Sequence, residues 1–118
     1  MIKDMIKNIV NSGYIDKFFV DNVEKKYGQI PDIVRKIISY NDNDRFIEKW
    51  RVISKPEILE SIETIHVDFV KIKLLPVIDV GDNDFICYDL KNNIWVMFNI
   101  VDEIDFNPKD SIYDYVVD

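Results

Sequence analysis

The sequence contains little of what most enzymes and metal centres require. Among its 118 residues there is one cysteine, Cys87, and one histidine, His66, so no intrachain disulfide can form and a cysteine–histidine set for structural zinc is absent. One histidine leaves little scope for acid–base catalysis. The three glycines, Gly13, Gly28 and Gly81, belong to no phosphate-binding pattern. We therefore expect a protein that is not an enzyme, with no catalytic residue, metal ligand or cofactor.

Long apolar runs are also missing. No run approaches the roughly 18 residues that predict a membrane-spanning helix, and residues 1–7 alternate apolar and charged side chains, unlike a secretory leader. The composition, 47% hydrophobic and 31% charged, is typical of a globular chain. A length of 118 residues suits one domain. We expect a single cytoplasmic domain over residues 1–118.

Basic residues are scarce in the last third of the chain. Residues 76–118 contain ten acidic residues and two basic ones, Lys91 and Lys109, whereas residues 1–75 contain 12 acidic and 13 basic residues. The whole net charge of −7 therefore arises in the C-terminal third. Such a field repels nucleic acid and anionic lipid and speeds encounter with basic proteins. The simpler interpretation is that the charge serves solubility alone.

Apolar spacing predicts three helices in the first third. Glycine and proline mark their ends, because Gly28 tolerates the left-handed backbone that often closes a helix and Pro31 suits a first helical turn. The predicted helices cover residues 2–10, 16–27 and 31–40. A polar loop is expected at residues 41–44.

The remainder of the chain predicts an antiparallel sheet. One strand at residues 46–53 is followed by a helix at 56–65, for which Ser54 and Glu57 form a capping box. Short turns rich in glycine and asparagine then separate three strands, at residues 73–80, 84–90 and 94–101. Apolar side chains on both faces of the strand at 84–90 predict that both faces are covered. With a last short helix at 112–117, capped by Ser111, the fold class is α+β.

Acidic residues gather in two segments near the predicted strand ends. Asp82 and Asp84 lie at one hairpin, close to Asp79, and Asp102, Glu103 and Asp105 follow the strand at 94–101. Carboxylate clusters can hold Mg²⁺ or Ca²⁺, but residues 79–84 read D-V-G-D-N-D, which is not the order of a calcium loop. The plainer interpretation is a solvated acidic rim of turn residues. The two segments could lie at the same end of the sheet or at opposite ends.

Several stretches resemble one protein family in their order and spacing. They are V-E-K-K-Y-G at 23–28 with Pro31 and I-I-S-Y-N at 37–41, W-R-V-I-S at 50–54, L-P-V at 75–77 with D-F-I-C-Y-D-L at 84–90 and I-W-V-M-F at 94–98, and S-I-Y-D-Y-V at 111–116. Together they resemble the SUKH superfamily, including its SMI/KNR branch, over residues 18–118. Two departures are Asp42, where the family has glycine, and a turn before Cys87 with fewer glycines.

The resemblance implies an α+β domain with N-terminal helices, a central, mainly antiparallel sheet and no catalytic centre. Bacterial members are mostly immunity proteins that bind and neutralise a toxin domain, often a nuclease. We therefore expect a basic toxin as the partner, no nucleic-acid or membrane partner, and a monomer or weak dimer. The residues expected to contact the toxin are Asp82, Asp84, Asp102, Glu103 and Asp105. The alternative is a non-catalytic scaffold or regulatory module of the same fold that binds a host protein, and a carboxylate enzyme ranks third.

Overall fold

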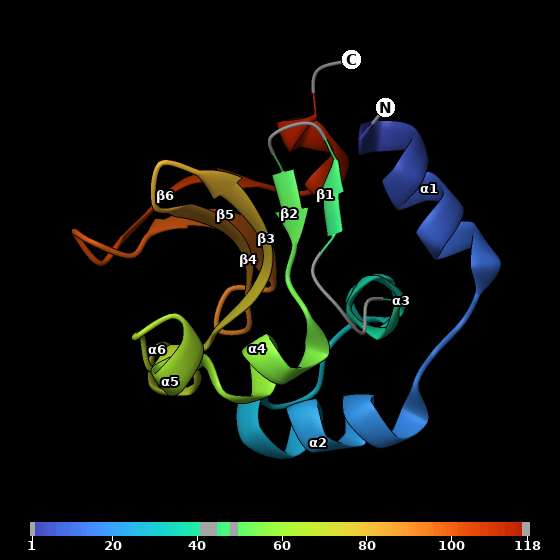
Figure 1. Cartoon of the computed structure of the whole chain (residues 1–118), viewed down its shortest axis with the longest axis horizontal. Helices are drawn as coiled ribbons and strands as arrows, with labels where there is room; N and C mark the ends of the chain where they lie inside the picture. Colours follow the sequence, from blue (N-terminus) through green and yellow to red (C-terminus); the bar gives the residue numbers. More distant parts are fainter. Residues whose placement is uncertain (1, 41–44, 48–49, 117–118) are drawn as a thin grey trace.

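The computed structural model describes residues 2–40, 45–47 and 50–116, and for 45–47 it describes the backbone alone. Three helices form its first third (Figure 1). They are α1 (Ile2–Ser12), α2 (Lys17–Tyr27) and α3 (Asp32–Ser39), in agreement with the predicted ranges. The carboxylate of Asp16 caps α2 by accepting the Phe19 N–H. Gly28 ends α2 with φ 110°, a left-handed value that favours glycine. The loop predicted at 41–44 lies outside the described residues.

Six antiparallel strands form one sheet in which each strand pairs with the next along the chain. In sheet order the strands are β1 (Arg45–Ile47), β2 (Trp50–Val52), β3 (Leu74–Gly81), β4 (Asp84–Asp89), β5 (Ile94–Asn99) and β6 (Ile104–Lys109). The antiparallel meander and the α+β class are confirmed. Figure 1 shows that the sheet is strongly curved.

Short helices complete the fold. Three of them, α4 (Lys55–Leu59), α5 (Ser61–Thr64) and α6 (Phe69–Ile72), connect β2 to β3, and a 3-10 helix, η1 (Ile112–Tyr115), follows β6. Ser111 caps η1 as predicted, because its hydroxyl accepts the Tyr113 N–H. In Figure 1, α4, α5 and α6 lie below the curved sheet, and α1 and α3 lie on the side of β1. No helix within the described ranges is long and apolar enough to cross a membrane.

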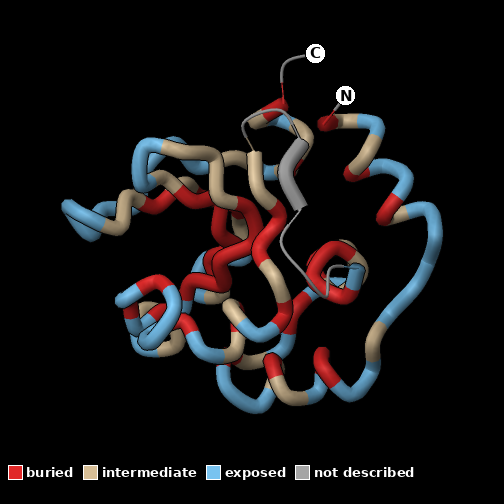
Figure 2. The backbone as a smooth tube through the Cα atoms, viewed as in Figure 1, coloured by how far each residue is buried: buried red, intermediate tan, exposed pale blue. Residues whose placement is uncertain are grey.

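One hydrophobic core joins the helices to the sheet. Phe69 of α6 packs against Phe85 and Phe98, with ring centroids 6.3 and 5.5 Å away. Further along the same two strands, Tyr88 and Trp95 lie opposite each other and make an edge contact at 5.4 Å. Successive residues of β4 are buried, as Figure 2 shows in red for the central strands. This confirms that both faces of β4 are covered.

Two predictions in the middle of the chain were wrong. The single strand predicted at 46–53 is instead the hairpin of β1 and β2, in which Ile47 pairs with Trp50. The helix predicted at 56–65 is split into α4 and α5, because the backbone of Glu60 is not helical. The Ser54 hydroxyl makes no capping hydrogen bond, and the Glu57 carboxylate binds Arg51 at 2.7 Å, so the capping box is not formed.

The strand β6 was missed altogether. The sequence around Asn107 and Pro108 was interpreted as a chain break, since proline cannot donate a ladder hydrogen bond. The strand exists because it is the last of the sheet, where one side of the backbone needs no partner strand. Its pairing with β5 shifts register between the partners of Trp95 and Met97, and this irregularity accommodates Pro108.

Candidate functional site

The two acidic segments meet at one end of the sheet. Asp82 lies in the β3–β4 turn and Asp84 begins β4, while Asp102 and Glu103 lie in the β5–β6 turn and Asp105 lies in β6. These turns are neighbours because β4 and β5 are antiparallel, with Asp84 opposite Asn99. Both turns lie at the left in Figure 1. The question that the sequence left open is therefore answered: the segments share one end, which we call the acidic end.

Asn99 links the two turns. Its side-chain amide donates to the Asp84 carboxylate at 2.9 Å, and its side-chain oxygen accepts the backbone N–H groups of Val101 and Asp102 at 3.0 and 2.9 Å. The N–H of Ile100 also donates to the Asn83 carbonyl at 2.9 Å. Because hydrogen bonds cross from one turn to the other, the acidic end is a single connected surface.

The β3–β4 turn has the geometry that its residues predict. Gly81 pairs with Asp84, which leaves Asp82 and Asn83 as a two-residue loop. Both loop residues have positive φ, 55° and 65°. Two-residue hairpins of type I′ require this backbone, and aspartate and asparagine adopt it more readily than most residues. The turn therefore fixes where Asp82 points.

Four of the five expected carboxylates at the acidic end are free to bind a partner. The carboxylates of Asp82, Asp102, Glu103 and Asp105 form no hydrogen bond or ion pair with another residue in the described part of the chain. Asp84, in contrast, is held by Asn99. These four carboxylates without partners are exposed to solvent, whereas most acidic side chains in the rest of the described fold hold a backbone or basic group.

Two nearby acids are structural. Asp79 pairs with Arg51 of β2 at 3.1 Å. The buried carboxylate of Asp89 accepts hydrogen bonds from the N–H groups of Lys91 and Asn92 and from the Asn92 amide, at 2.9, 3.2 and 2.8 Å. Both carboxylates are thus occupied by the fold, and neither is available to a partner.

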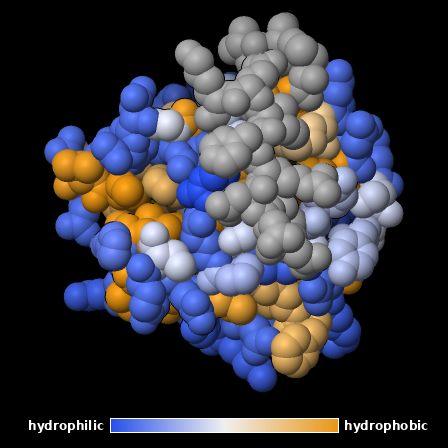
Figure 3. All heavy atoms as spheres, viewed as in Figure 1, coloured by the Kyte–Doolittle hydropathy of each residue, from blue (hydrophilic) through white to orange (hydrophobic). Residues whose placement is uncertain are grey.

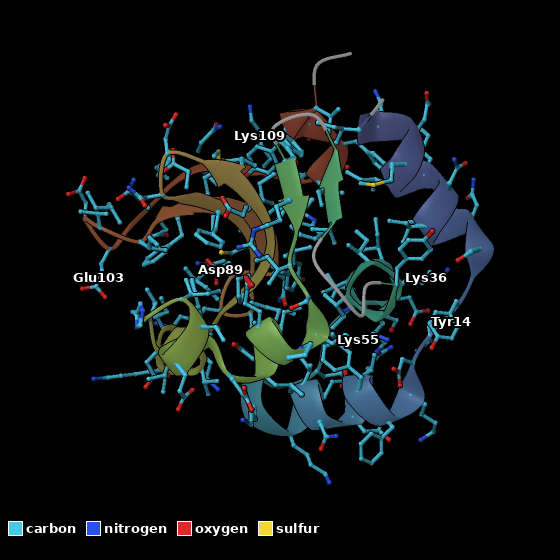
Figure 4. All side chains as sticks on the ribbon, viewed as in Figure 1. Tyr14, Lys36, Lys55, Asp89, Glu103 and Lys109 are labelled. Atoms are coloured by element: carbon cyan, nitrogen blue, oxygen red, sulfur yellow. The ribbon has the colours of Figure 1, made fainter. Side chains whose placement is uncertain are left out.

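A groove that the sequence did not reveal lies beside β6. It consists of two adjoining hollows of about 300 and 420 Å³, which share Asp89, Asn92 and Asp105. Its lining mixes apolar side chains with the charged side chains of Asp89, Lys91, Glu103 and Asp105. We call this surface the β6 groove; its apolar lining is Ile72, Leu74, Phe98, Ile94, Val96, Phe106 and Pro108. Figure 3 shows apolar atoms at the left, and Figure 4 places Asp89 and Glu103 on either side of that region.

Three exposed apolar side chains accompany the acids. Val101, Ile104 and Phe106 are 67%, 55% and 41% exposed. The only sequence signal for them is the mixture of apolar and acidic letters in V-D-E-I-D-F at 101–106, which suits a loop as well as a strand. The site therefore combines free carboxylates with apolar surface, which charge counting alone does not predict.

The two side chains with catalytic potential lie outside this site. Cys87 is wholly buried in β4, and burial raises the pKa of its thiol well above the ordinary value of 9.0, which disfavours the reactive thiolate. His66 is exposed between α5 and α6, with φ 65°. Within residues 2–40, 45–47 and 50–116, no three histidine, cysteine or acidic side chains are grouped so as to hold a metal ion.

No protein-family model, curated protein or solved structure matches this chain.

Proposed function

We propose that the chain is a SUKH-type immunity protein that binds a cognate bacterial toxin domain and covers its substrate surface with the acidic end. One observation carries this proposal: four exposed carboxylates without partners lie together on two linked turns at one end of the sheet. They are Asp82, Asp102, Glu103 and Asp105. A basic partner is the natural complement of such a surface.

The electrostatics suit a toxin that acts on nucleic acid. Such a toxin needs lysine and arginine to hold phosphates, so its active surface is positive. Carboxylates already occupied by the fold would gain little from that surface, but free ones can form ion pairs with it. A negative patch also accelerates the encounter with a positive one. The hydrogen bonds of Asn99 hold the turns in place before binding, which lowers the entropy lost in the complex.

The resemblance supports the same proposal from a different direction. It implies N-terminal helices followed by a mainly antiparallel sheet, and the fold has that order. A scaffold of the same fold would use the same surface for a host protein. An immunity protein protects the cell from a toxin and a scaffold does not, so the test must measure protection.

The test is co-expression with the toxic domain encoded beside this gene, scored by survival and by co-purification at low and high salt. The variant Asp102→Lys, Glu103→Lys, Asp105→Lys reverses three free carboxylates. We exclude Asp84 because it binds Asn99, and Asp82 because lysine suits its left-handed backbone poorly. The control Asp4→Lys, Glu63→Lys, Asp110→Lys gives the same net charge at exposed sites elsewhere.

We expect survival with the native chain and the control, and a complex that weakens as salt rises. The acidic-end variant should bind at least tenfold more weakly, about 1.4 kcal/mol, with a nearly unchanged Tm. Protection with equal affinity in both variants would exclude the acidic end as the contact while leaving the immunity function. Absence of both survival and complex would contradict immunity and favour the scaffold.

A further inference from the structure

The outer edge of β6 carries no other strand in the described part of the fold, because β6 is the last strand and pairs only with β5. Such an edge presents backbone N–H and C=O groups that can pair with an added strand. Its side chains Ile104 and Phe106 are exposed, and the β6 groove runs along the strand. A free edge, exposed apolar side chains and a groove thus occur together.

The usual protection of an edge strand covers only the far part of β6. Natural edges are blunted by bulges, proline and charge. Here the pairing irregularity and Pro108 lie at the C-terminal part, where Tyr115 also donates a hydrogen bond to the Asn107 carbonyl at 2.7 Å. The part from Ile104 to Phe106 pairs regularly with β5, and Asp105 is its one charged residue. This part can accept a strand.

We propose that β6 and its groove bind an extended segment of the partner protein, in which apolar side chains alternate with lysine or arginine. This rests on the proposed function and adds how the partner is recognised. An added strand places every second side chain on one face, so its apolar residues can cover Ile104 and Phe106, which lie on the face of β6 opposite to Asp105. Basic residues at the intervening positions then lie on the groove face, where they can meet Asp105 and Glu103.

Charge decides which occupant fits. A second copy of this chain carries the same net charge of −7 and would bring its own acidic end against Asp105. Like charges placed face to face in an interface are unfavourable. A basic extended segment gains the same electrostatic energy that a second copy loses. The free carboxylates around the groove therefore select a basic partner over self-association.

The experiment uses synthetic peptides about eight residues long, the length of an ordinary strand. The ¹⁵N-labelled full chain is titrated with the peptide KVKVKVKV and followed by NMR. Comparison peptides are EVEVEVEV, KSKSKSKS, and the first peptide N-methylated at every second backbone nitrogen. The chain variants are Phe106→Ala at the groove and Phe18→Ala, an exposed aromatic on α2, as the control.

We expect KVKVKVKV to shift the amide signals of β6 and of the groove lining, and the N-methylated peptide to bind at least tenfold more weakly. The Phe106→Ala chain should bind about fivefold more weakly, and the Phe18→Ala chain as the native one. Equal binding of KSKSKSKS would show attraction by charge alone and overturn the proposal. Equal binding of the N-methylated peptide, signals shifted elsewhere, or no binding would also overturn it.

The outcome is separable from that of the proposed function. Peptide binding at β6 by a chain that gives no protection from the toxin would contradict the immunity function and leave the strand site standing. Protection by the native chain and by Phe106→Ala alike, with no peptide bound, would leave immunity standing and exclude the strand site.

Discussion

At the scale of single residues, Asp89 shows how a buried charge is used by the fold rather than by a partner. Its side chain lies in the floor of the β6 groove, yet the residue is only 4% exposed and its oxygens accept three N–H groups of the following turn. Removing the carboxylate leaves the backbone N–H groups of Lys91 and Asn92 without this partner; both bonds are only partly buried, so each loss costs about 1 kcal/mol.

Asp89→Ala should therefore destabilise the chain by about 2 kcal/mol in urea unfolding. The matched control is Asn92→Ala, which removes one side-chain donor but leaves the carboxylate bonded to both backbone N–H groups, at a cost of about 1 kcal/mol. Similar losses for the two variants would contradict the assigned role of the carboxylate.

The pair of Asp16 and Lys55 makes a second prediction, for pH. Lys55 is only 8% exposed, and its ammonium lies 2.9 Å from the Asp16 carboxylate and 5.8 Å from the ring centres of Tyr14 and Phe19. The hydrogen bond from Lys55, and then that from the Phe19 N–H, hold the pKa of Asp16 below its ordinary value of 3.8. A lowered pKa stabilises the folded state above the unfolded pKa, and this stabilisation is lost as pH falls through the folded pKa.

Asp16→Asn keeps a good helix cap but has no charge to lose. The unfolding free energies of the two chains are compared in urea from pH 6 down to pH 2. An unfolded aspartate has a pKa of about 3.9, so the native chain should lose its extra stability over the variant mainly below about pH 4. The two chains should differ most near neutral pH. A constant difference across this range would show that the ion pair does not contribute.

At the scale of elements, Arg51 ties three of them together. From β2 its guanidinium reaches Glu57 of α4 at 2.7 Å and Asp79 of β3 at 3.1 Å. The Glu57 side chain is 14% exposed and its second oxygen has no hydrogen-bond partner among the described residues. Arg51 is therefore what makes the burial of the Glu57 charge tolerable.

Arg51→Met should destabilise the chain by about 3 kcal/mol, because it leaves Glu57 as a buried charge without its cation. Adding Glu57→Met should recover part of that loss, since the charge of Glu57 is then removed while Asp79 still lacks its cation. Chemical unfolding of the two variants measures the difference. If the double variant is less stable than the single one, the loss comes from packing and not from the uncompensated charge.

The elements that the sequence predicted well are those with an apolar stripe and clear ends. The first three helices and β3, β4 and β5 were found because buried side chains follow helical or strand spacing and glycine or asparagine marks the turns. The paired strands β1 and β2 were merged because three residues each are too few to show a period. The strand β6 was missed because burial leaves no pattern on an edge that is exposed along most of its length.

The candidate site was predictable only in its charge. Counting acids picked out the five residues as candidates, but their meeting at one end depends on the antiparallel pairing of β3 to β6, which the count does not contain. The β6 groove could not be predicted, because its lining comes from α6, from the strands β3 to β6, and from the β4–β5 and β5–β6 turns. No local sequence signal brings such distant residues together.

At the scale of the whole molecule, Cys87 reports on opening of the central sheet. It lies on β4 between two paired strands, its side chain is fully buried, and burial raises the pKa of its thiol. A thiol reagent can reach the sulfur only when the sheet opens. In the native state, Cys87 should therefore react at a rate that follows global unfolding.

This is measured by the reaction with a chromogenic disulfide reagent at increasing urea concentration. The labelling rate should rise with urea in step with the unfolding transition, and Arg51→Met should accelerate it by the same factor by which it populates the unfolded state. Fast labelling of the native chain without urea, unaffected by Arg51→Met, would show local exposure of β4 instead.

Because Asn99 links the two turns, the groups that fix the turns are different from the exposed side chains that we propose contact a partner. The side chains that we propose contact a partner, at residues 101–106 and at Asp82, are exposed, while the turns that carry them are fixed by backbone and amide hydrogen bonds. Exposed substitutions usually change stability by no more than about 0.5 kcal/mol. New specificities can therefore arise here by a few point changes, with the folded state unharmed at each step.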